Sequence, residues 1–355
     1  MPLHDVGYRS WSGRLQPPGS AALVIATTGI LLALKGRWVR RLLLLAWSPA
    51  MVFAFGFFAF EQALDEGRFA DARADLQPGQ VPAIRVRAAI GAVGAVLGGT
   101  LRGAAPAEGE TVDLAAARRQ VWTRLLMAFM RSPQAVLLTI VLGLVAPPLI
   151  SRDVRAKAWL VYFTRPVGVW DYILGKLAVL GVLVALITLL PALALWTMAV
   201  AVSPSLDVAL ATWDLPVRIV AASVALAAPT VLLALACSSL TAESRFAAFA
   251  WFAIWVACWI AHSALAGADL IAAAGVEPGA ARQGPGWLAR AAGLDGGIDR
   301  WAWLSLHHAL GVVQAWIFGI ERRAAAVVPP LVTMAAVVVG SLVVLARRVT
   351  APARR

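Results

Sequence analysis

The sequence predicts an all-α membrane protein that crosses the bilayer six times. Of its 355 residues, 61% are hydrophobic and only 14% are charged, and the mean hydropathy is +0.78. Soluble domains average about 45–50% apolar and about 25% charged residues. Six stretches lack Asp, Glu, Lys and Arg over roughly the 20 residues needed to cross a hydrocarbon core of about 30 Å. A soluble globule is therefore excluded, and so is a disordered chain, because disorder requires high charge and little apolar surface.

The six predicted spans define one transmembrane domain over residues 42–346. They cover about 42–60, 132–151, 177–203, 219–242, 246–266 and 324–346. Residues 61–131 and 267–323 are the long outer loops, and 347–355 form a cytoplasmic tail. Prolines inside a span are tolerated where neighbouring helices satisfy the freed carbonyls, and they are expected to mark bends. Such prolines are Pro147, Pro148, Pro191, Pro229, Pro329 and Pro330.

Two further apolar runs are too short to cross a membrane. Residues 1–41 form a cytoplasmic N-terminus in which the run 21–34 is followed by Lys35, Arg37, Arg40 and Arg41. This pattern indicates an interfacial helix lying on the membrane. The second run, 88–101, contains four glycines and is interpreted as part of a folded loop or a re-entrant piece rather than a seventh span.

The distribution of Lys and Arg predicts that both termini and the loop 151–176 are cytoplasmic. With the N-terminus inside, the inner segments hold 16 of the 31 basic residues but only four of the 19 acidic ones. This is the bias expected for the cytoplasmic side of a bacterial inner membrane. Anionic membrane lipids account for the basic charge, so no nucleic-acid partner is expected.

The spans lack the side chains of an ion-coupled transporter. Such proteins place ionisable residues inside their spans, and here the only one is His262, near the outer end of the fifth span. We interpret it as a headgroup-level or hydrogen-bonded histidine. Proton coupling is therefore not expected.

Motifs of enzymes and metal sites are also missing. There is no His-Glu-x-x-His and no Gly-x-Ser-x-Gly, and Gly175-Lys176 lacks the other residues of a phosphate-binding loop. The adjacent His307 and His308 point to different faces of a helix, and the two cysteines lie separately in apolar runs. This chain is therefore not expected to be an enzyme or to bind a metal or cofactor. The remaining roles are a permease powered by a separate subunit, and an accessory or scaffold protein without a substrate.

The loop between the second and third spans distinguishes these roles. Asp153 suits the first turn of a helix that continues through 156–163, and Pro166 disfavours helix at Arg165. A short cytoplasmic helix is therefore expected to end near residue 164, with Asp171 in the opening turn of the third span. The alternative is a solvated connector with ordinary interface aromatics. A plain connector does not require Trp159, Tyr162 and Phe163 within five residues.

This segment, LISRDVRAKAWLVYFTRPVGVWDYILGK, resembles the corresponding part of type-2 ABC-transporter permeases, in which an aspartate, a short coupling helix, a Tyr-Phe pair, an Arg-Pro break and Asp-Tyr-x-x-Gly-Lys occur in this order. The N-terminal GYRSWSG and RRLLLLAWSPAMVFAFGFFAFEQ fit a bacterial subgroup. The first outer loop departs from the family. The resemblance implies that two permease subunits, identical or different, pair above two ATPase subunits that hold ATP and Mg. Our interpretation is that such a transporter is an exporter, although the sequence does not itself reveal the direction of transport. It assigns the coupling role to Asp153, Trp159, Tyr162, Phe163, Arg165, Pro166, Asp171, Gly175 and Lys176.

A tryptophan stripe on the fifth span is a candidate for the substrate path. Trp251, Trp255 and Trp259 recur every four residues and so share one helix face. The resemblance implies that the second and fifth spans line the path. Helix packing or lipid contact is the alternative interpretation of the same stripe.

Overall fold

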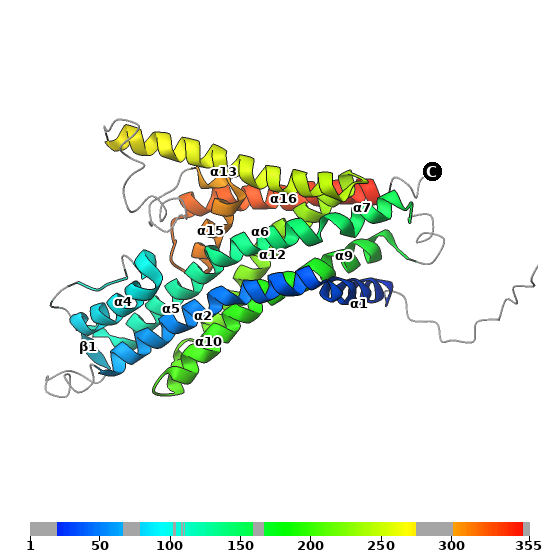
Figure 1. The fold of residues 1–355 in the computed structure, drawn as a ribbon. Coiled ribbons are helices and arrows are strands. Elements are labelled where there is room, and N and C mark those ends of the chain that lie inside the picture. Colours follow the sequence, from blue (N-terminus) through cyan, green and yellow to red (C-terminus); the bar gives the residue numbers. More distant parts are fainter. Residues whose placement is uncertain are drawn as a thin grey trace, which may run out of the picture.

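The computed structural model describes residues 20–66, 79–101, 104–107, 109, 111–158, 167–274 and 301–350. Within them, six helical segments are long and apolar enough to cross a membrane, and they lie together as an elongated bundle (Figure 1). Each overlaps one predicted span, so the prediction of an all-α protein with six such helices is confirmed. The segments are Arg37–Asp65, Leu114–Arg155, Val169–Val202, Asp214–Leu240, Ser244–Gly267 and Ala324–Thr350.

The helices and strands of the described residues occur in the following order. The first half contains α1 (Ser20–Lys35), α2 (Arg37–Glu66), β1 (Gln80–Pro82), α4 (Ala83–Leu97), η1 (Gly98–Leu101), β2 (Thr111–Asp113), α5 (Leu114–Arg131), α6 (Pro133–Val145) and α7 (Pro147–Arg155). The second half contains α9 (Val169–Val184), the π-helix η2 (Ala185–Leu189), α10 (Leu190–Val202), α11 (Asp207–Ala211), α12 (Asp214–Leu240), α13 (Ser244–Ala274), η4 (Ala302–Leu304), α15 (Leu306–Ile317) and α16 (Ala324–Thr350).

The second span is the central part of a much longer helical column. The helices α5, α6 and α7 together cover 42 residues, which is about 63 Å at 1.5 Å per residue and twice the thickness of a hydrocarbon core. The column is interrupted at Ser132 and Ala146, each directly before a proline that begins the next helix. Ala146 keeps right-handed helical dihedrals, so the bend expected at Pro147 stays a prediction.

The first predicted outer loop is largely folded. The helix α4 packs on α2, where Leu97 lies against Gly56, and β1 pairs antiparallel with β2. The buried carboxylate of Glu61 accepts hydrogen bonds from Arg118 Nε at 3.0 Å and from Trp122 Nε1 at 3.1 Å. Paired charges allow α2 to continue past residue 60 and allow helix to begin before residue 132, at Leu114. Charge-free stretches therefore mark only part of each of these helices.

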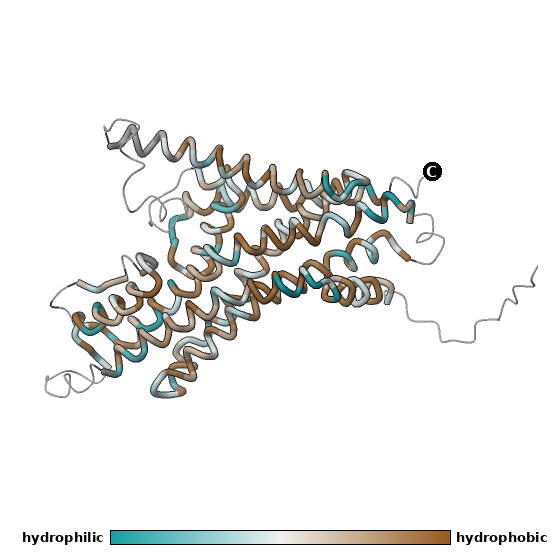
Figure 2. Tube along the Cα trace, in the orientation of Figure 1, coloured by the Kyte–Doolittle hydropathy of each residue, from teal (hydrophilic) through white to brown (hydrophobic). Residues whose placement is uncertain are grey.

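The helix α1 packs closely on α9 (Figure 1). A Cβ atom built on Gly175 of α9 would lie 2.7 Å from the side chain of Ile25, and one built on Gly29 of α1 would lie 2.5 Å from Val179. The two glycines thus allow the two helix backbones to approach each other. Hydrophobic residues predominate along the bundle, and hydrophilic ones gather toward helix ends and near the junction of α1 with α2 (Figure 2).

Candidate functional site

The candidate site lies where α7 ends and α9 begins. Asp153 lies in the last turn of α7, not in the first turn of a separate helix as predicted. The chain leaves the helix through a turn at 156–158, in which Lys157 has a φ of +50°. Basic residues in the last turn, Arg152 and Arg155, suit a helix C-terminus because their charge complements the negative end of the helix dipole. The expected continuation of a helix from residue 156 is therefore wrong over 156–158.

A carboxylate joins the end of α7 to the first turns of α9. Asp153 Oδ2 accepts a hydrogen bond from the Tyr172 hydroxyl at 2.7 Å and lies 2.8 Å from Lys176 Nζ. Lys176 Nζ also donates to the carbonyl of Leu149 at 2.7 Å and lies 5.3 Å from the centre of the Tyr172 ring. The side chains of Asp153 and Lys176 are 18% and 14% exposed. We call Asp153, Tyr172 and Lys176 the α7–α9 lock.

The start of α9 is fixed independently of the lock. Asp171 lies in its opening turn, as predicted, and Oδ2 of this residue accepts a hydrogen bond from the Gly168 backbone N–H at 3.1 Å. A carboxylate here also faces the partial positive charge of the helix N-terminus. Gly175, two turns into the helix, is the point where α1 makes its close contact.

Five of the predicted coupling residues lie outside the described residues. They are Trp159, Tyr162, Phe163, Arg165 and Pro166. The predicted coupling helix therefore remains a prediction beyond residue 158. The four predicted residues that are described, Asp153, Asp171, Gly175 and Lys176, all lie around the two ends of this segment.

Serine side chains connect the first turn of α7 to two other helices. The Ser238 hydroxyl of α12 accepts hydrogen bonds from the backbone N–H groups of Ile150 and Ser151 at 3.1 and 3.2 Å. It also donates to the Pro147 carbonyl at 2.5 Å. The hydroxyls of Ser151 and Ser244, at the start of α13, lie 2.8 Å apart. We call Ser151, Ser238 and Ser244 the serine network; it satisfies backbone donors that an opening helical turn leaves unpaired.

A more exposed ion pair lies beside the serine network. Arg155 at the end of α7 lies 2.5 Å from Glu243, in the connection between α12 and α13, and donates to the Ala242 carbonyl at 3.1 Å. The two charged side chains are 55% and 43% exposed. This pair therefore bridges the same elements as the serine network but in contact with solvent.

The predicted tryptophan stripe is divided between the interior and the surface. Trp251 is buried against α6 and donates from Nε1 to the Thr139 carbonyl at 2.9 Å. Trp255 is half-buried with its ring 5.5 Å from that of Trp251, whereas Trp259 is 45% exposed. Gly143 of α6 leaves room for Trp251. The geometry makes Trp251 a packing residue between α6 and α13, and Trp259 is the most accessible member of the stripe.

A histidine cluster, which the sequence did not predict, lies toward the other end of the bundle. The buried rings of His262 in α13 and His308 in α15 are stacked with centroids 3.5 Å apart, and His307 lies edge-on to His308 at 5.2 Å. The buried Arg131 lies across Gly311 of α15. Burial, together with the charge of Arg131 and the proximity of His262, lowers the pKa of His307 to about 4.

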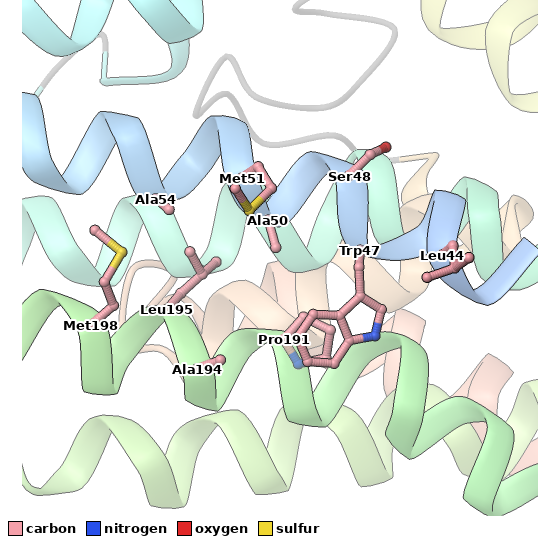
Figure 3. Close-up of a pocket in the computed structure, with 10 residues that line it drawn as sticks. All are labelled: Leu44, Trp47, Ser48, Ala50, Met51, Ala54, Pro191, Ala194, Leu195 and Met198. Carbon is pink, nitrogen blue, oxygen red and sulfur yellow. The ribbon is translucent and has the colours of Figure 1, made fainter.

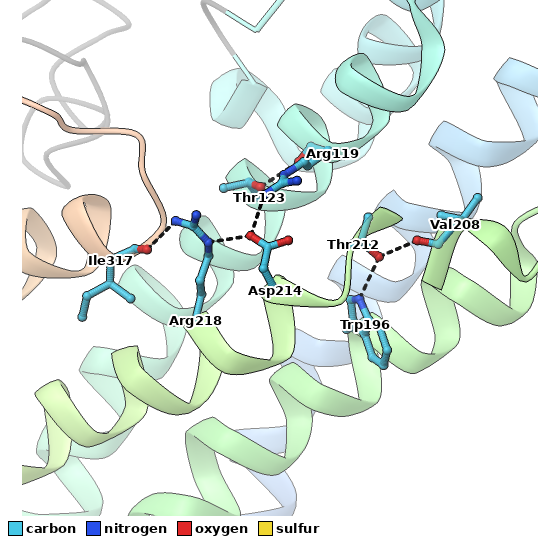
Figure 4. A network of polar contacts seen from close by, with 8 residues as sticks. All are labelled: Arg119, Thr123, Trp196, Val208, Thr212, Asp214, Arg218 and Ile317. Carbon is cyan, nitrogen blue, oxygen red and sulfur yellow. Dashed lines mark hydrogen bonds and ion pairs between the residues drawn. The ribbon is translucent and has the colours of Figure 1, made fainter. Parts of the chain in front are cut away.

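A carboxylate near the same end joins three helices (Figure 4). Asp214 Oδ2, in the first turn of α12, accepts hydrogen bonds from Arg119 of α5 at 2.6 Å and from Arg218 Nε at 2.7 Å. Arg218 also donates to the Ile317 carbonyl at the end of α15, at 2.6 Å. These contacts fix α5, α12 and α15 to one another.

Tyr172 and Ser238 are the principal site residues that sequence reasoning missed. Tyr172 stood within the Asp-Tyr-x-x-Gly-Lys motif, four residues before Lys176 and thus on the same helix face, which was a usable signal. Ser238 carried no such signal, because its partners are almost 90 residues away in the chain. Comparison with protein-family models, curated proteins and solved structures finds no match for this chain.

Proposed function

We propose that this chain is the membrane-spanning permease subunit of an ATP-driven exporter in a bacterial inner membrane. ATP and Mg would be bound by a separate ATPase subunit, and two permease subunits would pair. Both termini and the segment 156–168 would face the cytoplasm, with α1 lying near the membrane surface. The proposal rests on the resemblance in the segment 149–176 and on the contacts at its two ends.

One observation carries the proposal: both ends of an aromatic-rich loop are held by the α7–α9 lock. The helix α7 ends at Arg155 and α9 begins at Val169, and Asp153 joins these two ends through Tyr172 and Lys176. A connector that only spans two helices does not require such fixation. A loop that must transmit a force does, because a displacement is passed on only through segments that are held together.

The serine network extends this coupling beyond the two adjoining helices. Ser151 of α7 contacts Ser244 of α13, and Ser238 of α12 bonds to the backbone of α7. A displacement of the loop would therefore reach α7, α9, α12 and α13 together. In the proposed mechanism, an ATPase subunit moves the loop and these helices follow as a rigid body.

Co-purification with an ATPase tests the proposal. The full chain, purified from its native membrane in mild detergent, should bring down an ATPase subunit in near-equal amount, and the complex should hydrolyse ATP. Replacing Tyr162 and Phe163 together by Ala should weaken the association at least tenfold, because an anchoring aromatic at an interface contributes about 1–2 kcal/mol or more. A matched pair, Trp213→Ala with Trp303→Ala, removes two exposed aromatics elsewhere and should leave the association unchanged.

The alternative is a polytopic accessory or scaffold protein without transport activity. Recovery of the intact chain without any ATPase, or equal retention by the two double variants, would favour this alternative. In the second case the loop would be a connector, and the α7–α9 lock would serve only the stability of the fold.

A further inference from the structure

An apolar groove runs between α2 and α10 (Figure 3). It has a volume of about 350 Å³ and is lined by residues between 44 and 54 on α2 and between 191 and 198 on α10. Its polar groups are already paired: the Ser48 hydroxyl donates to the carbonyl of Leu45 at 2.8 Å, and Trp47 Nε1 donates to the carbonyl of Leu186. The groove therefore offers its occupant hydrocarbon contacts and little hydrogen bonding.

The length of the groove matches one leaflet of a bilayer. From Leu44 to Ala54 the helix rises about 15 Å, at 1.5 Å per residue, which is half of a hydrocarbon core of about 30 Å. The groove begins within one turn of Arg41, the last charged residue before the apolar part of α2. A single acyl chain that starts at the membrane surface would end where the groove ends.

The π-helical turn η2 in the third span leaves a carbonyl that holds Trp47, a residue of the groove wall, in place. In η2 the Leu190 N–H donates to the Ala185 carbonyl, five residues earlier. The next donor in this register would be Pro191, which has no N–H, so the Leu186 carbonyl has no backbone donor at that position. Trp47 Nε1 supplies the hydrogen bond at 3.1 Å, and Figure 3 shows its ring directed toward Pro191. This hydrogen bond ties Trp47 on the α2 wall of the groove to the third span, which forms the other wall.

Cationic residues stand at the end of the groove nearest the membrane surface. Arg37 and Arg41 precede Leu44 and Ser48 at helical spacing and therefore share the face of α2 that lines the groove. Both arginines are exposed, and Arg41 lies 5.5 Å from the centre of the Trp38 ring. Within the described residues, neither forms an ion pair with a carboxylate.

We infer that the groove binds a phospholipid with an anionic headgroup. The acyl chain lies along α2 and α10, and the phosphate lies against Arg37 and Arg41. Charge complementarity and the one-leaflet length favour a lipid over a second copy of this chain, whose own Arg37 and Arg41 would be repelled. The site is independent of the proposed transport function, since it requires only that α2 crosses a membrane.

Lipid retention in native mass spectrometry tests this site. The full chain is exchanged into an equal mixture of phosphatidylglycerol and phosphatidylcholine with identical acyl chains at low salt. The wild type should retain phosphatidylglycerol preferentially. Arg37→Gln with Arg41→Gln should weaken that binding by roughly 30-fold, because each cation near the surface contributes about fivefold. The control, Arg347→Gln with Arg348→Gln, removes two exposed arginines at the end of α16 and should keep the preference.

A groove-filling variant tests the position of the acyl chain. Ala194→Phe places a ring in the groove and should lower retention of both lipids. The inference is overturned if the Arg37 and Arg41 variant binds lipid like the wild type, or if the Arg347 and Arg348 control loses the preference equally. It is also overturned if Ala194→Phe leaves lipid retention unchanged and alters only the monomer–dimer ratio, because the occupant would then be a second copy.

Discussion

The strongest energetic test of the candidate site is a double-mutant cycle on Asp153 and Lys176. The two charged atoms are 2.8 Å apart, and the side chains are only 18% and 14% exposed. With an effective dielectric constant of about 20, their Coulomb attraction is about 6 kcal/mol, most of which desolvation offsets. We expect a coupling free energy of about 2 kcal/mol, above the range of about 0.2–1 kcal/mol for exposed pairs.

The variants are Asp153→Asn, Lys176→Met and their combination, with unfolding followed by SDS titration in mixed micelles. Asp153→Asn keeps an acceptor for the Tyr172 hydroxyl, so it removes the charge with little change in shape. Lys176→Met leaves the carboxylate without its cation and should be the more destabilising single change. The double variant should recover part of that loss.

The control cycle uses the Arg155 and Glu243 pair, with Arg155→Met and Glu243→Gln. These atoms are closer, at 2.5 Å, but the side chains are 55% and 43% exposed, so a coupling below about 1 kcal/mol is expected. A coupling at Asp153 and Lys176 no larger than this control would refute the reasoning. The two ends of the loop would then be held by helix packing alone.

Three further predictions concern other parts of the fold. Gly175→Ala should destabilise the protein by about 1–3 kcal/mol, because the added methyl group pushes α1 away from α9. Gly181→Ala, on the same helix, meets open space and should be neutral or stabilising. Equal effects of the two changes in the same titration would contradict this. Trp47→Phe removes the donor to the Leu186 carbonyl and should cost about 0.5–1.5 kcal/mol, measured by thermal unfolding; an unchanged melting temperature would show that another donor replaces it. The pKa of His307 is about 4 in the folded protein and 6.5 in a model compound, so below pH 6.5 the unfolded state binds more protons than the folded state. The free energy of unfolding should therefore fall as the pH drops from 6.5 toward 4, by about 2 kcal/mol at pH 5. His307→Gln should lose that part of the acid sensitivity, and an unchanged pH profile of melting would contradict the assignment.

The six spans were predictable because their signal is local. A charge-free run of about 20 residues identifies the membrane-crossing part of a helix without any tertiary information. Asp171 was placed correctly for the same reason, since an acidic residue suits an opening turn. The ends of the helices were not predictable in this way. The pairing of Glu61 with Arg118, 57 residues later, allows α2 to continue to Glu66.

The misplacement of Asp153 has a specific cause. The predicted second span ended at Ser151, which made Asp153 look like the start of a new helix. In the structure a new helix begins earlier, at Pro147, and Ser238 of α12 supplies the acceptor for its unpaired Ile150 N–H. That partner is 88 residues away in the chain and has no sequence signature. The stacking of His262 on His308 depends on tertiary contact in the same way.

The polar contacts divide the bundle into two groups of helices. Near one end, the α7–α9 lock and the serine network join α7, α9, α12 and α13. Toward the other end, Asp214 joins α5, α12 and α15. The helix α12 belongs to both groups, and α13 also reaches the second group through the stacking of His262 on His308. The column of α5, α6 and α7 runs between the groups and is interrupted at Ser132 and Ala146. Each interruption stands before a proline, which has no N–H to donate, so the backbone hydrogen-bond ladder of the column is weakest at these two points. If the loop after α7 transmits a displacement, as we propose, we expect the column to yield at these two points.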